Sequence, residues 1–230
     1  MKKRRRNMLT VTVDWEHPSD PQQGYAYVNL LAQLREVLPA PRYILASCLP
    51  AGQWALRNID LSKAAQYLDL LNIMAYDFAG PWTNKTGHQA QLYSRSGSPI
   101  SCQSTVNYVL SQGVDPKKLL LGVPVYGRSF LASSKPGEQY AGIGGEDGVF
   151  DYKDLPRPGA KEHHDDKSGA AYCSGGDGGF VTYDTTRTVQ MKAKFASKMR
   201  LGGLFYWQMA SDARGPKSLI ETGYNTLHEM

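Results

Sequence analysis

The feature that most constrains the fold is a regular alternation of strand patterns and amphipathic helix patterns. Strand patterns are predicted at residues 9–16, 43–49, 68–76, 118–126 and 203–209. Helix patterns are predicted at residues 25–38, 61–67, 104–112, 185–199 and 217–227. Strand starts are about 30 residues apart, with one longer gap, which is the rhythm of βα units in a parallel sheet. We therefore expect an α/β protein.

The longer gap separates the last two strand patterns. It spans about 75 residues, is rich in glycine and aromatic residues, and interrupts the regular alternation of strand and helix patterns. Two short strand-like pieces lie in it, at residues 148–152 and 179–183. We interpret this segment as a small α+β insertion.

Composition and charge exclude several classes of protein. The chain has 230 residues, of which 41% are hydrophobic and 20% charged, as in an ordinary globular domain. It contains no apolar run of about 18 residues, so we expect no membrane span. The net charge of +5 comes largely from the basic run at residues 2–6. A nuclear signal or nucleic-acid arm is one interpretation of this run; a solvated terminus or misplaced start codon is the favoured one.

Metal and nucleotide sites are not indicated. Cys48, Cys102 and Cys173 are odd in number and lack a CxxC spacing, which argues against a zinc site or a disulfide scaffold. One bridge plus one free thiol stays open. The His-His-Asp-Asp run at residues 163–166 is interpreted as a polar loop, because adjacent side chains cannot all face one ion. No glycine-rich phosphate cradle follows a strand, so we expect no cofactor.

Two carboxylates stand at the end of the first strand pattern. In a strand, residues two apart share a face, so Thr12, Asp14 and Glu16 are expected on one face and Trp15 on the other. A carboxylate beside another has a raised proton affinity, which suits a general acid near neutral pH. The alternative is an exposed strand end with two solvated acids.

The other strand patterns also end in polar or aromatic residues. In a parallel α/β sheet, chemistry collects at the carboxyl ends of the strands. Acids together with aromatic rings suit a carbohydrate, which offers an apolar ring face and an edge of hydroxyls. The residues at these ends are Met74, Tyr76, Asp77, Tyr126, Arg128, Trp207 and Gln208.

Four motifs resemble the chitinases of glycoside hydrolase family 18, most closely the fungal type. They are DWEHP at 14–18, MAYDF at 74–78, GVPVYGR at 122–128 and GGLFYW at 202–207. The resemblance implies a TIM-type (β/α)₈ barrel with an α+β insertion, of which this chain holds about five βα units, strands four to eight. The implied domains are a partial barrel at 1–128, the insertion at 129–184 and the last βα units at 185–230.

The resemblance also implies a function, which is substrate-assisted, retaining hydrolysis of β-1,4-linked N-acetylglucosamine polymers. Glu16 would be the general acid, Asp14 would orient the acetamido group, and Tyr76 would donate its hydroxyl to it. The implied partner is chitin or its oligosaccharides, and neither nucleic acid nor a membrane is expected. The resemblance also implies a monomer and an extracellular location. Substrate-binding positions would be Trp15, Met74, Asp77, Tyr126, Arg128 and Trp207.

The chain departs from the family pattern in two respects. The family motif DxxDxDxE places its first two acids on Leu9 and Thr12, neither of which is acidic. A barrel of this kind takes about 250 residues before insertions, so we expect an N-terminal truncation. Activity is therefore expected to be reduced or absent. The alternatives are a non-catalytic chitin-oligosaccharide-binding protein and an inactive fragment.

Overall fold

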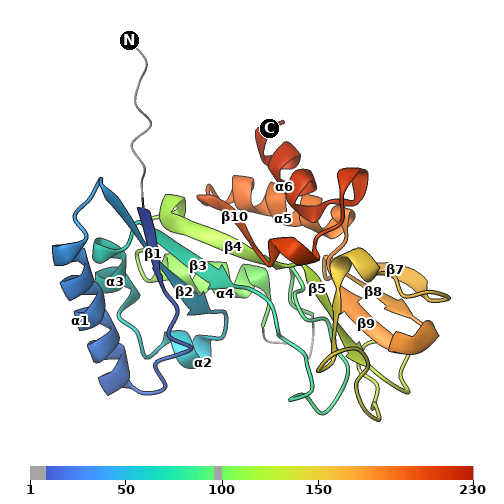
Figure 1. Cartoon of the computed structure of the whole chain (residues 1–230). Helices are drawn as coiled ribbons and strands as arrows, with labels where there is room; N and C mark the ends of the chain where they lie inside the picture. Colours follow the sequence, from blue (N-terminus) through green and yellow to red (C-terminus); the bar gives the residue numbers. More distant parts are fainter. Residues whose placement is uncertain (1–8, 96–99, 230) are drawn as a thin grey trace.

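Two five-stranded sheets form the framework of the protein (Figure 1). The computed structural model describes residues 9–95 and 100–229. The first sheet is parallel, in the order β1-β2-β3-β4-β10, and this confirms the expected α/β class. Its strands are β1 (Leu9–Val13), β2 (Tyr43–Pro50), β3 (Leu70–Met74), β4 (Leu119–Pro124) and β10 (Gly203–Trp207).

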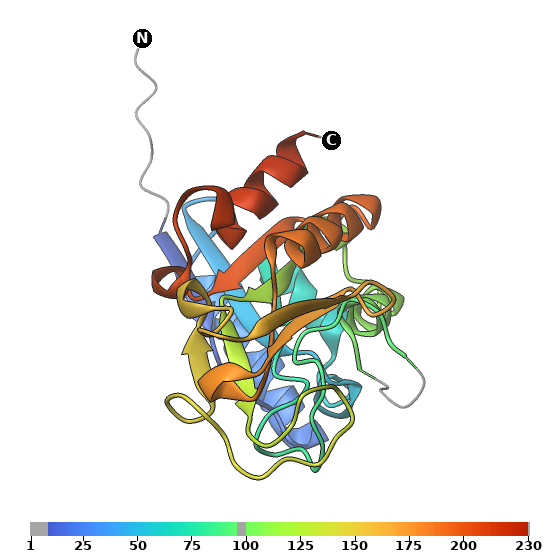
Figure 2. The ribbon, with the colours of Figure 1, turned by 90° about the vertical axis from the view of Figure 1, so that its right-hand side faces the viewer.

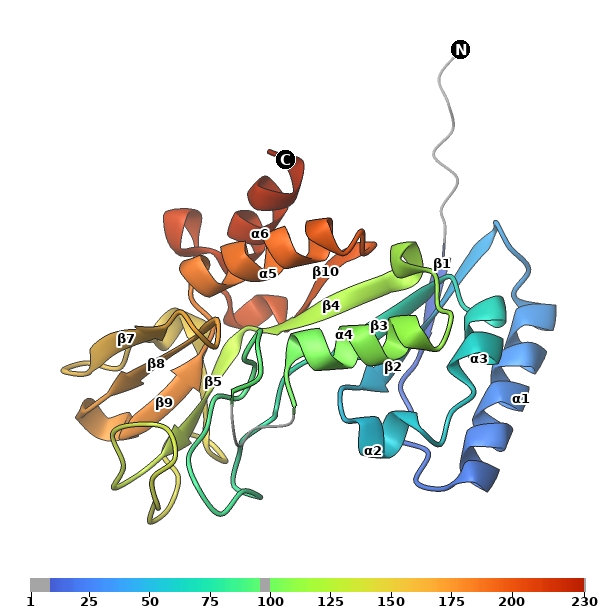
Figure 3. The same cartoon turned by 180° about the vertical axis from the view of Figure 1, so that it is seen from behind.

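The helices cover one face of the parallel sheet. Figure 3 shows α4 and α3 on the near side of this sheet, α1 beside α3 at the right-hand edge, and α5 and α6 near β10. None of the described helices is long and apolar enough to cross a membrane. The helices are α1 (Pro21–Val37), α2 (Gln53–Leu56), α3 (Leu61–Tyr67), α4 (Cys102–Ser111), α5 (Thr186–Lys198) and α6 (Leu219–His228).

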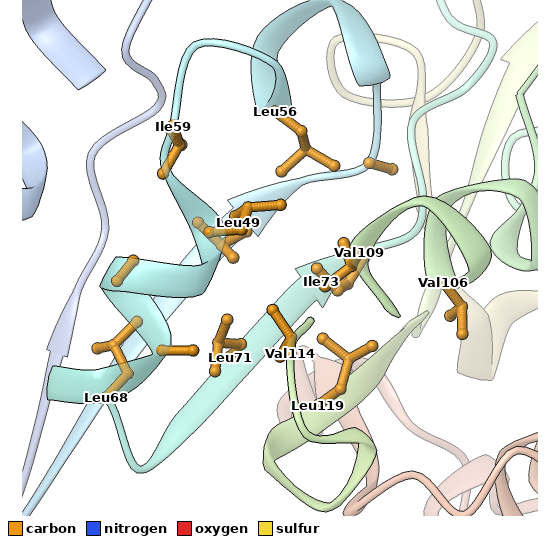
Figure 4. Packing of buried hydrophobic residues seen from close by; sticks show 14 of the residues in the cluster. Leu49, Leu56, Ile59, Leu68, Leu71, Ile73, Val106, Val109, Val114 and Leu119 are labelled. Atoms are coloured by element: carbon orange, nitrogen blue, oxygen red, sulfur yellow. The ribbon is translucent and has the colours of Figure 1, made fainter. Parts of the chain in front are cut away.

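Strand residues at alternate positions supply the core beneath the helices. Leu71 and Ile73 of β3 are fully buried there, together with Leu49 of β2 and Val109 of α4 (Figure 4). The β3 residues between them, such as Asn72, are only half-buried. Because successive strand side chains point to opposite faces, the half-buried row faces away from the helices. We call that side of the parallel sheet the open face.

Two helices begin earlier than the sequence patterns predicted. The helix expected from residue 25 starts at Pro21, because the Asp20 carboxylate accepts from the Gln23 N–H at 2.8 Å and proline suits the first helical turn. The helix expected from residue 104 starts at Cys102, where Ser101 forms a capping box with Ser104. Helix α2 was not predicted.

The second sheet is antiparallel, in the order β6-β5-β9-β8-β7. Figure 2 shows it in yellow to orange, in front of the parallel sheet. The expected strand-like pieces are present as β6 and β9. Its strands are β5 (Tyr126–Phe130), β6 (Val149–Asp151), β7 (Lys161–Asp165), β8 (Ala170–Ser174) and β9 (Phe180–Tyr183).

The structure corrects two predictions about this region and settles the state of the cysteines. The strand expected at 118–126 stops at Pro124, and Tyr126 already belongs to the second sheet. The polar loop expected at 163–166 is largely an edge strand, in which His163 pairs with Tyr172 of β8. Within the described residues no group of side chains is arranged to hold a metal ion. All three cysteines are free thiols, so the bridge left open by the sequence does not form.

A buried ion pair ties the second sheet to α5. Lys192 is 0% exposed and Asp184, just after β9, is 2% exposed; the Lys192 ammonium binds one carboxylate oxygen. The Thr188 hydroxyl donates to the other oxygen at 2.6 Å. A buried charge is costly to desolvate, so each partner depends on the other.

Replacing Lys192 with methionine is expected to lower the free energy of unfolding by about 3–5 kcal/mol, because Asp184 would be left buried and unpaired. Urea denaturation followed by circular dichroism measures the loss. The matched control is Arg187→Met on the same helix, since the Arg187–Asp166 pair is exposed and should cost less than about 1 kcal/mol. Equal losses in the two variants would contradict this account.

Candidate active site

Asp14 and Glu16 lie just beyond β1, on the open face. The strand expected at 9–16 ends at Val13, whose carbonyl accepts from the Ser47 hydroxyl at 2.8 Å. Exposure nevertheless keeps alternating, so that Thr12, Asp14 and Glu16 are exposed. The expectation that these three side chains share a face therefore agrees with the structure.

Trp15 lies on the opposite side. Its ring is 6.3 Å from the ring of Tyr27 in α1 and packs against the core beneath the helices. The two-residue period that exposes the carboxylates turns Trp15 away from them. The structure therefore does not bring Trp15 to the other predicted substrate-binding residues.

Tyr76 contacts two aromatic rings and lies near several acidic side chains. Its ring meets those of Tyr126 and Phe205 edge-on, with centroids 6.2 and 6.3 Å away. Burial raises the pKa of the Tyr76 phenol, and the nearby charges act in the same direction, so the hydroxyl stays a hydrogen-bond donor. The carboxylates that act on it are those of Asp77, Glu16 and Asp14, in decreasing order of effect.

Asp77 joins the two sheets. It follows β3, and its carboxylate accepts from the Tyr126 hydroxyl at 2.8 Å and from the Arg128 guanidinium at 2.9 Å through both Nε and Nη2. Such a two-pronged contact fixes the orientation of both partners. Burial, and then the Asp77 carboxylate, hold the pKa of Tyr126 well above its usual value. We call Asp77, Tyr126 and Arg128 the Asp77 cluster.

Met74 and Trp207 complete the set of predicted residues. Met74 is the last residue of β3 and is half-buried. Trp207 is the last residue of β10, 57% exposed, and pairs in register with Pro124 of β4. Phe205 lies two positions earlier on β10, and its contact with Tyr76 places both β10 rings on the open face.

The sequence patterns missed several residues at this edge of the sheet. Cys48 and Asn72 pair in register within β2 and β3, and Asn72 Oδ1 is buried without a hydrogen-bond partner in the described part of the chain. Their positions between buried apolar residues were a detectable signal. Two tryptophans that follow β2 and β3, Trp54 and Trp82, are 60% and 58% exposed. The Trp82 ring lies 4.9 Å from the Arg128 guanidinium carbon.

A separate cavity of about 890 Å³ lies between the segment after β3 and the β7–β8 hairpin. Its lining includes His88, Arg95, Lys135 and Tyr172, with Asp165 as its acid. The Asp165 carboxylate already accepts a hydrogen bond from the Arg95 guanidinium, with an Nη1–Oδ2 distance of 3.0 Å. Because the cavity lacks a pair of free carboxylates, the open face is the better candidate for acid–base chemistry.

Comparison with known proteins points to the same family as the sequence motifs. The model of the Glycosyl hydrolases family 18 matches residues 4–212. Endochitinase 1 of Metarhizium robertsii is 34% identical over 94% of this chain, and Chitinase 1 of Aphanocladium album is 32% identical over the same share. The matches cover 55% of each relative, so the chain spans about half the length of these curated relatives.

Solved structures agree with the fold. Catalytic domain 2 of the Ostrinia furnacalis Group II chitinase superposes with a TM-score of 0.87 at 25% identity, covering 95% of this chain and 66% of that one. A plant class V chitinase mutant from Cycas revoluta, in complex with (GlcNAc)3, gives 0.83 at 28% identity, covering 94% and 66%. The expected barrel type, of which the parallel sheet is an open part, is confirmed. The chain belongs to glycosyl hydrolase family 18.

Proposed function

We propose that this protein is a chitinase-type glycoside hydrolase, which cleaves β-1,4-linked N-acetylglucosamine polymers with retention at the anomeric carbon. The observation that carries the proposal is the position of Tyr76. Its phenol lies near the carboxylates of Asp77, Glu16 and Asp14, so an acid, a charge stabiliser and a neutral donor meet at one place.

The proposed reaction starts with attack by the substrate's own acetamido oxygen on the anomeric carbon. As the bond from that carbon to the glycosidic oxygen breaks, Glu16 gives its proton to the leaving oxygen. Asp14 stabilises the positive charge that develops on the acetamido group, and Tyr76 donates its hydroxyl to the acetamido oxygen. Water then attacks the anomeric carbon while the bond from that carbon to the acetamido oxygen breaks, and the water loses its proton to the Glu16 carboxylate, which restores the acid.

Substrate binding is assigned to the neighbouring side chains. A pyranose ring has an apolar face that stacks on an exposed aromatic ring, which Trp207 offers at the end of β10. Met74 ends β3 and Asp77 follows it, and β3 lies between β1 and β10 in the strand order. Met74 and the Asp77 cluster would contact the sugar. Because the Cycas revoluta chitinase is described with (GlcNAc)3, chitin oligosaccharides are the first ligands to test.

Glu16→Gln is expected to reduce hydrolysis of a chromogenic N-acetylglucosamine oligomer at least about a hundredfold, because the amide cannot supply the proton. Glu36→Gln, an exposed position on α1, is the control for loss of one carboxylate and should hydrolyse like the wild type. Equal rates in the wild type and Glu16→Gln would remove Glu16 from its assigned role.

Thr12 is proposed to limit the rate. It shares the exposed face with Asp14 but brings no charge, so Asp14 has a carboxylate neighbour, Glu16, on one side only. Thr12→Asp is therefore expected to raise kcat about tenfold or more. Thr10→Asp places the same charge two residues further from Asp14 on the same strand face and should change kcat far less. Steady-state kinetics on both variants compare the two positions.

Thr12 also favours a second candidate, a chitin-oligosaccharide-binding protein without hydrolytic activity. Titration calorimetry with N-acetylglucosamine oligomers separates the two functions. Saturable binding by the wild type with no product after long incubation would support the binding protein. Product formation that depends on Glu16 would support the hydrolase.

A further inference from the structure

Gln89 is a fully buried polar residue that belongs to neither a helix nor a strand. It lies between β3 and α4, and its exposed fraction is 0%. Its amide oxygen has no hydrogen-bond partner in the described part of the chain, so the side chain bonds only through its amide nitrogen. Since a buried amide is costly unless it is bonded, the donor contacts indicate why the residue stands there.

The amide nitrogen of Gln89 donates to two backbone carbonyls of the antiparallel sheet. The Nε2–O distances are 2.8 Å to Tyr126 of β5 and 3.2 Å to Thr182 of β9. Strands β5 and β9 pair from Arg128 onward, opposite Thr182, and Tyr126 lies before this ladder begins. The Gln89 amide therefore supplies the Tyr126 carbonyl with the donor that β9 does not.

The backbone of Gln89 makes two further contacts. Its carbonyl accepts from the N–H of Phe78 at 2.9 Å, and its own N–H donates to the Thr182 hydroxyl at 3.2 Å. Phe78 directly follows Asp77. Gln89 is therefore hydrogen-bonded to three residues of this region. They are Tyr126 itself, Phe78, which follows Asp77, and Thr182, which pairs with Arg128.

The Asp77 cluster needs such a tie. Asp77 follows a strand of the parallel sheet, whereas Tyr126 and Arg128 belong to the antiparallel sheet, and in the described residues no ladder joins the two. Asp77 also has φ 59°, in the left-handed region that is uncommon for residues other than glycine. The bidentate contact with Arg128 is directional, so a small shift between the sheets would break it.

We propose that Gln89 is a positioning residue for the candidate active site. It holds Asp77, Tyr126 and Arg128 in one arrangement by bridging the segment after β3 to β5 and β9. Its contribution to oligosaccharide binding rests on the proposed function, in which the Asp77 cluster contacts the sugar. Its contribution to the geometry of the Asp77–Arg128 contact does not.

The first test is Gln89→Met, which keeps the side-chain length and removes both donors. The matched control is Gln91→Met in the same segment, a buried glutamine whose amide donates instead to the Ile100 carbonyl at 2.7 Å. We expect Gln89→Met to raise KM for N-acetylglucosamine oligomers about tenfold, with kcat within about threefold. Gln91→Met should change neither, once circular dichroism shows both variants folded.

A readout without substrate keeps the two proposals separate. The Arg128 Nε–H donates to Asp77, so its ¹⁵N–¹H resonance should move in Gln89→Met and stay in place in Gln91→Met. An unchanged Arg128 resonance in folded Gln89→Met would overturn the positioning role. If the wild type neither binds nor cleaves chitin oligomers, the proposed function fails, while this resonance still decides the role of Gln89.

Gln89→Glu provides a pH-dependent rescue and a second route if Gln89→Met does not fold. A protonated carboxyl donates one hydrogen bond, and an ionised one donates none; burial raises the pKa of such a carboxyl. The Arg128 resonance and the oligomer affinity are each compared with those of the wild type at the same pH. Both should be close to wild type at pH 5, where the carboxyl is protonated, and differ from wild type at pH 8, where it is ionised. A variant-to-wild-type ratio that does not change with pH would count against donation by this side chain.

Discussion

The two-residue period of the parallel strands determines which side chains form the core and which form the candidate site. One row of side chains, represented by Leu71 and Ile73, is buried beneath the helices and supplies the hydrophobic stabilisation of the fold. The other row is free of the helices and carries the polar and aromatic groups of the candidate site. Because one backbone geometry sets both rows, moving a strand by a single residue would exchange core and site.

Much of the fold was predictable from the sequence because its signals are local. In the described residues, apolar runs and helical periods located the five parallel strands and five of the six α-helices. The antiparallel sheet was largely missed: β7 carries a His-His-Asp run, with exposed and half-buried side chains, that has no apolar signature. Its strand character comes from pairing with β8, a contact that a single segment of sequence does not encode.

The candidate site was predictable to a similar degree. Residues that follow strands, such as Glu16, Tyr76 and Asp77, were found because carboxyl ends of parallel strands meet at one edge. Gln89 escaped notice because it lies far from any strand end and acts through backbone groups of other residues. Trp15 was predicted to bind the substrate because it belongs to the DWEHP motif. The alternation of side chains along the strand instead directs it to the core.

The distribution of tryptophan has a spectroscopic consequence. Trp54, Trp82 and Trp207 are all more than half exposed and follow or end strands of the parallel sheet, whereas Trp15 alone packs against the core. Most of the native emission therefore originates from indoles already in water at the rim of the sheet. Intrinsic fluorescence of this protein should report molecules that reach that rim more sensitively than it reports loss of the hydrophobic interior.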